Sequence, residues 1–412
     1  MHPTRRVLLQ TMGLAAACVG ITPSFVFAAT PKDARLVVII LRGAIDGLSV
    51  VVPYGDPDYA AARGAIAIGR PGTENGALTL TSEFGLHPSL AQLHKRYAAG
   101  ELIAFHAVAT PYRERSHFDG QDVLENGTSK PYGTQDGWLN RALVGADRSS
   151  AKPVGLAVGQ TVPLILRGPA SVTSWAPEVL PAVDEDTLNR LMDLYAQDKV
   201  LGPALARAVA TNALLSEMPA KGASSDDDVS RSMANPGQAA ANPARYAAGV
   251  ARSVGTLLAA PDGPCVAVID LTGWDTHANE SGALAQRLAA LDAGLEALSE
   301  GLGSTWSHTA VLIVTEFGRT VAINGTNGTD HGTGTMSLLV GGRVAGGRVV
   351  AEWPGLSTSA LLAGRDLKPT LDLRAVSKGV LADHLGVDNS QLAARVFPGS
   401  DSVTPMRGLI RA

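Results

Sequence analysis

Residues 36–41 read LVVIIL, an unbroken apolar run that ends at Arg42 and Gly43. Runs of this length, rich in branched side chains, are typical of strands buried on both faces of a mostly parallel sheet. Later runs repeat the pattern, and each also ends in a polar or glycine-containing turn. They are 102–108 (LIAFHAV), 265–271 (CVAVIDL), 310–314 (AVLIV) and 337–340 (SLLV).

Helical patterns separate these runs along the chain. We expect helices over 88–99, 116–125, 136–143, 186–215, 244–259, 282–302 and 374–385. Strands that alternate with helices predict a wound α/β fold, with a mostly parallel central sheet and helices on both faces. Residues 219–243 break the alternation. This stretch is rich in Ser, Asp, Ala, Gly and Asn, which predicts a flexible surface loop inserted into a single domain.

The first 28 residues have the pattern of a cleavable export signal. Arg5 and Arg6 are adjacent, no further Lys, Arg, Asp or Glu follows until Lys32, and small residues surround the expected cleavage after Ala28. The paired arginines favour the twin-arginine route, with the twin-arginine translocase as partner. An uncleaved anchor is the alternative, but glycines and a proline weaken it. We therefore expect a mature domain, residues 29–412, in the periplasm or secreted, with no stable membrane anchor.

Charge and cysteine content narrow the function classes. The chain has 34 Lys and Arg against 38 Asp and Glu, a net charge of −4. This balance argues against nucleic acid or an anionic membrane surface as a partner. Cys18 lies in the expected signal, so that the mature chain keeps only Cys265 and forms no intrachain disulfide.

Acidic and histidine side chains follow the predicted strands. Ligands of open α/β sheets bind outside the carboxyl ends of the strands, so these side chains are expected to converge. Four carboxylates packed together without a cation would repel one another, and a divalent metal removes that cost. The expected metal ligands are Asp46, Asp275, His277, Glu316, Asp330 and His331.

The donor types leave the ion open. Carboxylate oxygens suit Mg²⁺, Ca²⁺ or Mn²⁺, added imidazole suits Zn²⁺ or Mn²⁺, and the set is large enough for one or two ions. Each residue also has a purely structural interpretation. Asp46 would cap the next segment, Asp275 would hydrogen-bond a turn, Glu316 would pair with Arg319, and Asp330 with His331 would form a polar turn.

The loop after 102–108 carries a different kind of site. Ser116 precedes a predicted helix with Asp119 three residues later, which is typical of a helix N-cap. A helix N-terminus also favours anions, and Arg113 and Arg115 lie nearby, with Arg319 as a further anion-binding candidate. If a metal lies within reach, Ser116 becomes a candidate nucleophile. His117 is a candidate general acid, metal ligand or packed core residue.

Several stretches together resemble a known family: LRGAIDGL, YRERSHFD, GWDTH, TEFGRT and NGTNGTDHG. With the leader, they are similar to the exported bacterial family called domain of unknown function 1501, within the alkaline phosphatase and sulfatase superfamily. The resemblance implies an alkaline phosphatase-like fold, metal ligands among the acidic and histidine set, and Ser116 in the nucleophile region. The chain departs from the superfamily in the tight spacing of Asp275 and His277, and it lacks the sulfatase signature around Ser116.

Two functions fit these features. The first is an exported metal-dependent hydrolase of phosphate or sulfate esters, with a small anionic ester as substrate. The second is a non-catalytic, metal-stabilised periplasmic binding or assembly protein with the same fold.

Overall fold

The computed structural model describes residues 33–144, 153–177, 185–195, 197–198, 200–216 and 242–411. The expected export signal and all but the last two positions of the 219–243 stretch lie outside the described residues.

The described residues form a central nine-stranded sheet in the order β11-β5-β10-β9-β1-β8-β6-β7, with β12 beside β5. Its strands are β1 (Arg35–Arg42), β5 (Leu102–Ala109), β6 (Gly155–Val158), β7 (Val172–Trp175), β8 (Val266–Thr272), β9 (Thr309–Val314), β10 (Thr335–Val340), β11 (Arg348–Val350) and β12 (Leu371–Asp372). Only β10 runs antiparallel to its neighbours, β9 and β5. The prediction of an α/β fold with a mostly parallel sheet is confirmed.

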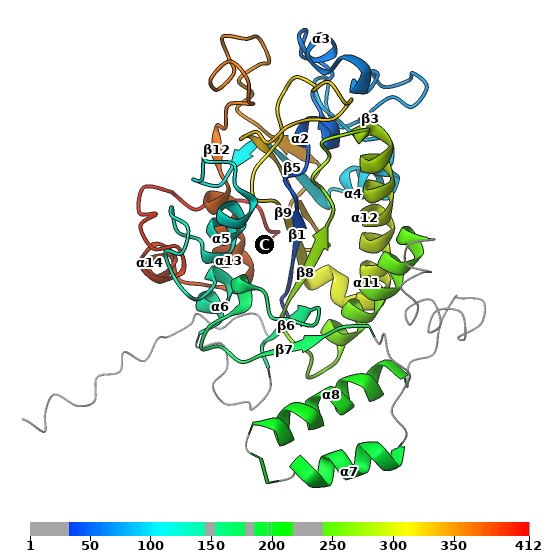
Figure 1. Cartoon of the computed structure of the whole chain (residues 1–412), viewed down its shortest axis with the longest axis vertical. Coiled ribbons are helices and arrows are strands. Elements are labelled where there is room, and N and C mark those ends of the chain that lie inside the picture. The colour runs from blue at the N-terminus through cyan, green and yellow to red at the C-terminus, as the bar shows by residue number, and fades with distance from the viewer. Residues whose placement is uncertain are drawn as a thin grey trace, which may run out of the picture.

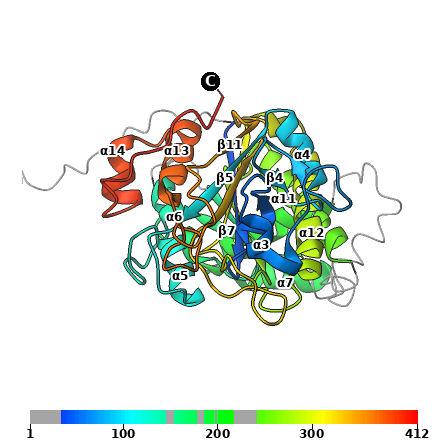
Figure 2. The same ribbon diagram turned by 90° about the horizontal axis from the view of Figure 1, so that it is seen from above.

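Helices cover both faces of this sheet, as Figures 1 and 2 show. One face carries α4 (Ala91–Ala98), α11 (Pro243–Ala259) and α12 (Glu280–Leu302), and the other carries α5 (His117–Asn126), α6 (Trp138–Leu143) and α13 (Leu373–Leu385). A small second sheet joins β2 (Val51–Val52), β4 (Gly85–Leu86) and β3 (Leu78–Thr79). The short helices are α2 (Gly47–Val50), α3 (Tyr59–Arg63) and α14 (Asn389–Gln391).

One predicted helix, 186–215, is wrong as a single element. The structure has α7 (Glu185–Tyr195) and α8 (Leu201–Ser216) instead. Asp198 Oδ1 accepts the backbone N–H of Val200 and of Leu201, both at 2.8 Å, which is the bonding of a helix start. Pro203 then falls in the first turn of α8, where its missing N–H costs little.

The two cores explain the apolar runs. In β1, Val37, Ile39 and Leu41 pack into a cluster with side chains of α11 and α12. The alternate residues Leu36, Val38 and Ile40 pack into a second cluster with α6 and α13. Because side chains alternate between faces along a strand, burial on both faces requires the unbroken apolar run.

The strand directions show which edge of the sheet is the expected ligand-binding edge. β1, β5, β8 and β9 are parallel and end at the same edge, and antiparallel β10 begins there. The loops that follow β1, β5, β8 and β9 therefore lie at the same edge as the loop that precedes β10. No described helix has both the length and the apolar character needed to cross a bilayer.

Candidate metal centre

Three side chains at this edge meet closely. The ligand atoms of His117, Asp275 and His331 all lie within 4.8 Å of one another. His117 is the first residue of α5, after β5, and Asp275 follows the end of β8 by three residues. His331 precedes β10 and is held by a bridge to Arg319. The antiparallel direction of β10 therefore brings His331 to the edge where β5 and β8 end.

A third imidazole, that of His277, joins this group. The Nε2 atom of His331 lies 2.9 Å from Nε2 of His117 and 3.0 Å from Nε2 of His277. The Asp275 carboxylate approaches all three rings, with Oδ1 at 3.0 Å from His277 Nε2 and 3.3 Å from His331 Nε2, and Oδ2 at 3.4 Å from His117 Nε2. We call these four residues the His3Asp cluster.

The opposite ring nitrogens fix the tautomers. His117 Nδ1 donates to Glu316 Oε1 at 2.9 Å, His277 Nδ1 donates to Asp330 Oδ1 at 3.2 Å, and His331 Nδ1 donates to the Arg115 carbonyl oxygen at 3.0 Å. These partners are carboxylates or a carbonyl, which accept, so each Nδ1 carries the hydrogen. In a neutral ring the lone pair is then on Nε2.

The converging lone pairs belong to a group whose ligand atoms could hold a metal ion. Protons satisfy the arrangement poorly, because one Nε2–H can serve only one neighbouring Nε2. The hydrogen bond to Glu316 raises the pKa of His117, whereas burial and the charge of His117 lower the pKa of His331. The pKa values of the two rings therefore shift in opposite directions. His117, Asp275 and His331 supply two imidazole nitrogens and a carboxylate, a donor set that suits a divalent metal with borderline-soft preference, and each ring of the cluster has the outer hydrogen-bond acceptor usual for such ligands.

Arg319 holds Asp275 in place. Its side chain is buried, and it donates to Asp275 Oδ1, to the Thr329 carbonyl and, through Nε at 3.0 Å, to Thr329 Oγ1. Burial would raise the pKa of Asp275, but the hydrogen bond and charge of Arg319 outweigh it and lower that pKa. The interpretation of Arg319 as a substrate-binding cation is corrected, because its guanidinium is already engaged.

Asp46 does not join the cluster. It caps α2, accepting Leu48 N–H at 3.3 Å, and its Oδ2 pairs with Arg63. Arg63 NH2 also lies 3.5 Å from Glu280 Oε1, and all three side chains are at most 1% exposed. Of the predicted ligands, Asp46 is therefore corrected to a buried ion-pair residue, since Arg63 supplies the positive charge that a metal was expected to supply.

Glu316 and Asp330 were predicted as metal ligands, but in the structure they contact the histidines of the cluster and are not members of it. Glu316 is fully buried and accepts from Gly43 N–H at 2.9 Å and Gln121 Nε2 at 3.1 Å as well as from His117. Asp330 is exposed and accepts from Asn324 Nδ2 at 3.2 Å as well as from His277. Their carboxylates orient the imidazoles rather than replace them. The expected pair between Glu316 and Arg319 is not formed.

The first glycine of LRGAIDGL, Gly43, is required by the close packing of β1 against the segment that carries Asp275. Gly43 has φ +122°, and a Cβ atom there would lie 2.6 Å from the backbone nitrogen of Asp275. A side chain at this position would push β1 away from the segment that carries Asp275.

Ser116 occupies the N-cap position of α5, but its side chain makes no capping hydrogen bond. The expected partner Asp119 instead lies 3.4 Å from the Tyr112 hydroxyl. Arg115 donates to Asp366 Oδ2 at 2.7 and 3.0 Å, and its φ of +60° accompanies the contact of its carbonyl with His331. Arg113 is exposed and donates to nearby backbone carbonyls. Ser116 therefore lies between Arg115, whose carbonyl oxygen contacts His331, and His117, which belongs to the cluster.

Comparisons with known proteins place this chain in a family. A family model described as "Protein of unknown function (DUF1501)" matches residues 33–397. The chain belongs to this family. No curated protein matches it.

The solved structures similar to this DUF1501 chain are distant. Ps i-CgsB in complex with k-i-k-neocarrahexaose has a TM-score of 0.36 and 11% identity, over 77% of this chain and 68% of that one. The C-terminal periplasmic domain of EcEptC from Escherichia coli, in complex with Zn, has 0.35 and 10%, over 76% and 74%. Alkaline phosphatase from the Antarctic bacterium TAB5 has 0.33 and 12%, over 76% and 91%.

Sequence reasoning missed several residues of the DUF1501 site. Gln121, Arg63 and Glu280 contact the predicted residues. Gln121 lies inside the predicted helix 116–125, where polar side chains are common, whereas Arg63 and Glu280 lie outside the predicted helices. Glu280, three residues after His277, is the nearest to a detectable signal. Its neighbour in space, Arg63, lies more than two hundred residues away in the chain, and only the fold brings them together.

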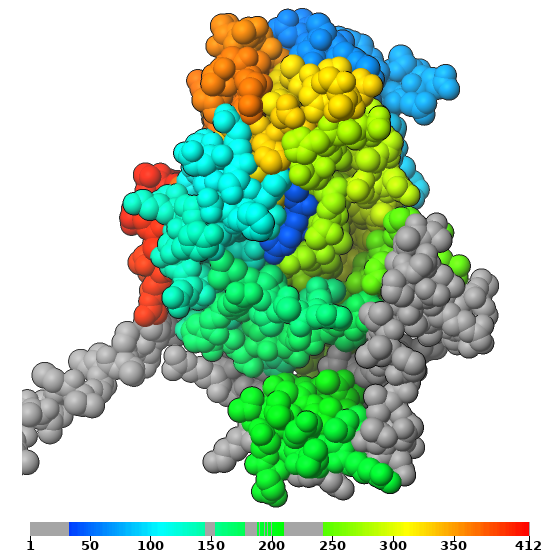
Figure 3. Space-filling model, in the orientation of Figure 1, coloured from blue at the N-terminus to red at the C-terminus, as the bar shows by residue number. Residues whose placement is uncertain are grey.

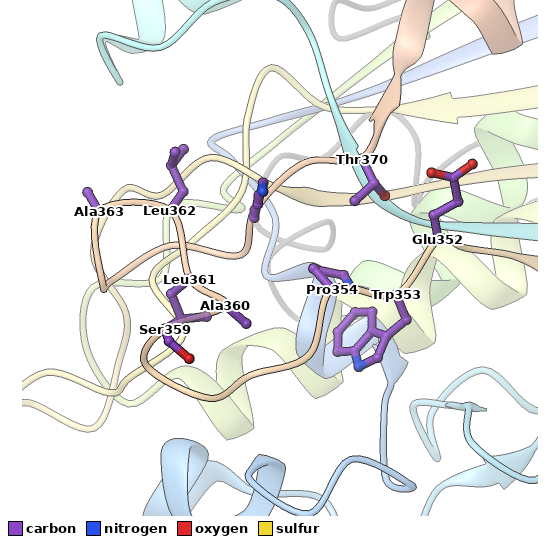
Figure 4. A pocket seen from close by; sticks show the side chains of 10 residues that line it. Glu352, Trp353, Pro354, Ser359, Ala360, Leu361, Leu362, Ala363 and Thr370 are labelled. Carbon is purple, nitrogen blue, oxygen red and sulfur yellow. The ribbon is translucent and has the colours of Figure 1, made fainter.

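An open cavity of about 600 Å³ lies elsewhere on the molecule, after β11. Figure 4 shows Trp353 and Pro354 facing the turn that carries Ser359 and Leu361. None of the histidines or acids of the His3Asp cluster lines it. The cluster itself is partly open to solvent, with side-chain exposures from 23% for His117 to 46% for His277.

Proposed function

We propose that this DUF1501 protein binds one divalent ion, Zn²⁺ in preference, at the His3Asp cluster, and that it hydrolyses phosphate or sulfate esters outside the cytoplasm. The observation that carries the proposal is the convergence of three imidazole Nε2 atoms on one carboxylate, each ring held by an acceptor at Nδ1. Imidazole nitrogen with one carboxylate favours Zn²⁺ or Mn²⁺ over Mg²⁺ or Ca²⁺.

The division of charge supports one ion rather than two. Two of the predicted acidic ligands have a guanidinium partner. Asp46 pairs with Arg63, and Asp275 pairs with Arg319. Asp46 and Glu280 share Arg63 in a buried group, which leaves no cluster of unpaired carboxylates there that needs a second metal. In the His3Asp cluster, by contrast, there are more potential metal-ligand atoms than positively charged side chains to pair with them.

The start of α5 supports an anionic substrate. The first amides of a helix have no partner within it, and the Ser116 side chain leaves them uncapped. In this ten-residue helix they lie beside His117, and the helix dipole favours negative charge at the same place. A phosphate or sulfate group held there would lie against both Ser116 and the cluster.

This arrangement assigns roles to the residues. A bound divalent ion would supply polarisation of the ester oxygen. The α5 amides hold the anion, and the Ser116 hydroxyl forms the new bond to phosphorus or sulfur while the alcohol leaves with a proton. Water then hydrolyses the Ser116 ester and restores the hydroxyl. Glu316 and Asp330 keep His117 and His277 oriented throughout.

The location follows from the leader. A twin-arginine signal exports folded proteins, so we propose that the ion is loaded in the cytoplasm before the translocase carries the protein out. Protein that acquires its ion equally well after unfolded secretion would contradict this order of events.

The experiment measures metal and turnover together. Protein purified from the periplasm is expected to hold about one Zn²⁺ per chain and to hydrolyse p-nitrophenyl phosphate or sulfate. His331→Ala should lose both properties, and Ser116→Ala should lose turnover alone. His94→Ala is the matched control, because His94 lies on α4 and its Nε2 is hydrogen-bonded to the Thr79 carbonyl at 2.8 Å, not to a residue of the cluster. Absence of bound metal, with thermal stability indifferent to chelator, would contradict the metal site. Bound metal without turnover of any ester would favour the non-catalytic binding protein.

A further inference from the structure

A groove leads away from the His3Asp cluster. Figure 3 shows a hollow between α5 (cyan) and the β8 region (yellow-green), with β1 (blue) at its floor. The one residue of β1 that is not fully buried is Arg42. Thr272, its register partner at the end of β8, is exposed. The floor of the groove is therefore polar, although both neighbouring cores are apolar.

Arg42 is connected to the cluster by hydrogen bonds. Its NH1 donates to Gln121 Oε1 at 3.0 Å, and Gln121 Nε2 donates to Glu316 Oε1 at 3.1 Å. Glu316 in turn accepts from His117. A group bound over Arg42 would therefore lie near enough to the cluster to belong to the same substrate molecule.

The groove has more acceptors than donors. Arg42 pairs with Glu125 at 2.8 Å and with Asp270 at 2.9 Å, so two carboxylates face one guanidinium. Asp270 Oδ1 is buried and has no hydrogen-bond partner among the described residues. The Asp270 side chain as a whole is 29% exposed, so a ligand that donates hydrogen bonds can approach this carboxylate from the groove. A second anion would be repelled here.

One wall of the groove ends in an exposed aromatic ring. Phe118, Gln121 and Glu125 are spaced i, i+3 and i+7, so they share one face of α5. Gln121 and Glu125 on that face both contact Arg42. Phe118, next to His117, is 84% exposed. A phenyl ring in water offers only its apolar face, which suits a ring with an apolar side.

From these observations we propose that the groove, formed by Arg42, Phe118, Gln121 and Asp270, binds the alcohol part of the substrate, and that this part is a neutral, hydroxyl-rich ring of the sugar type. Its hydroxyls donate to the acidic floor, and its C–H face stacks on Phe118. The inference rests on the proposed ester hydrolysis for its orientation, because the anionic group points to the His3Asp cluster.

The experiment compares alcohol parts at a constant anionic group. For zinc-loaded protein, kcat/KM is measured with glucose 6-phosphate, methyl phosphate and 2-aminoethyl phosphate, and with glucose 6-sulfate and methyl sulfate. We expect at least a tenfold preference for the glucose ester. Phe118→Ala should reduce that preference about fivefold, within the range of one aromatic contact. Asp270→Asn should also reduce it. Leu194→Ala is the control, since Leu194 is 70% exposed on α7, which lies apart from α5 and β8 in Figure 1.

A binding measurement keeps the inference separate from catalysis. Saturation-transfer NMR with cellobiose, which has no ester, should show contact with wild type and Leu194→Ala but not with Phe118→Ala. If no ester is turned over yet cellobiose binds in this manner, the hydrolase proposal fails and the groove stands. Equal kcat/KM for glucose and methyl esters, a preference for the aminoethyl ester, or no cellobiose contact would overturn the groove proposal.

Discussion

Replacing Glu316 with glutamine should weaken metal binding while leaving the fold intact. Glu316 is fully buried, and its Oε1 accepts from Gly43 N–H, His117 Nδ1 and Gln121 Nε2 at 2.9 to 3.1 Å. Oε2 lies 3.0 Å from Thr315 Oγ1. A glutamine keeps the oxygen that accepts three bonds, and its NH2 group donates to the Thr315 hydroxyl. The substitution therefore removes the negative charge and little else.

The expected effect on the ion follows from the role of that charge. A carboxylate behind an imidazole makes the opposite nitrogen a stronger ligand, and loss of such a partner typically lowers metal affinity 10- to 100-fold. That range corresponds to about 1.4 to 2.8 kcal/mol of binding free energy. The hydrogen bond to Glu316 also raises the pKa of His117, so the variant should titrate this ring at lower pH.

Competition with a chromophoric zinc chelator measures the affinity, and calorimetry measures the fold. Glu125→Gln is the matched control, because Glu125 is a buried carboxylate on α5, the helix that begins at His117, and its hydrogen-bond partners are Arg42 and the Ile165 N–H rather than an imidazole of the cluster. A folded Glu316→Gln protein with wild-type zinc affinity would refute the assignment of Glu316 as a partner of a metal ligand. An equal loss in Glu125→Gln would refute its specificity.

Three further predictions concern stability. Chelator should lower the free energy of unfolding by about 2.7 kcal/mol relative to zinc at one hundred times its Kd, and unchanged melting would contradict a bound ion. Asp46→Asn should keep one zinc per chain but lose roughly 3 to 5 kcal/mol in urea denaturation, because Arg63 loses its closest partner; loss of zinc from the folded variant would instead make Asp46 a ligand. Burial and the neighbouring Asp46 raise the pKa of Glu280 to about 8, above its unfolded value, so its contribution to stability is complete at acidic pH and is lost as pH rises through about 8. Wild type should therefore lose more stability between pH 5 and 8 than Glu280→Gln, and parallel curves would contradict the shift.

The central strands could be predicted because burial on both faces leaves a one-dimensional signal. LVVIIL has no polar position, and the structure buries its alternate residues in two different cores. No signal in the sequence indicated the direction of β10, because a short apolar run such as SLLV does not indicate whether a strand is parallel or antiparallel to its neighbours. Direction matters here because the start of β10, not its end, lies beside His331. The helix break at Asp198 was also invisible to apolar periodicity, because both flanking segments are helical.

The candidate site was predictable in its composition but not in its pairing. The sequence placed Asp46, Asp275 and Glu316 after strands, and all three follow strands in the structure. Which of them faces a metal depends on where the arginines lie, and Arg63 reaches Asp46 from a separate short helix. His117 had three open interpretations because its neighbours in sequence say nothing about β10, the strand that brings His331 to it.

The arginines distinguish two kinds of acidic group at this sheet edge. Around Asp46 and Glu280, Arg63 is buried and also donates to the Thr320 and Val321 carbonyls, so its position is fixed before any ligand arrives. Around Asp275, Arg319 contacts Oδ1 of the carboxylate, and Oδ2 faces the imidazole of His117. A fixed guanidinium makes the first group permanent and structural. The second group is partly open to solvent, and its ligand atoms could hold a metal ion. At this sheet edge a metal ion is therefore expected at the solvent-exposed group and not at the buried one.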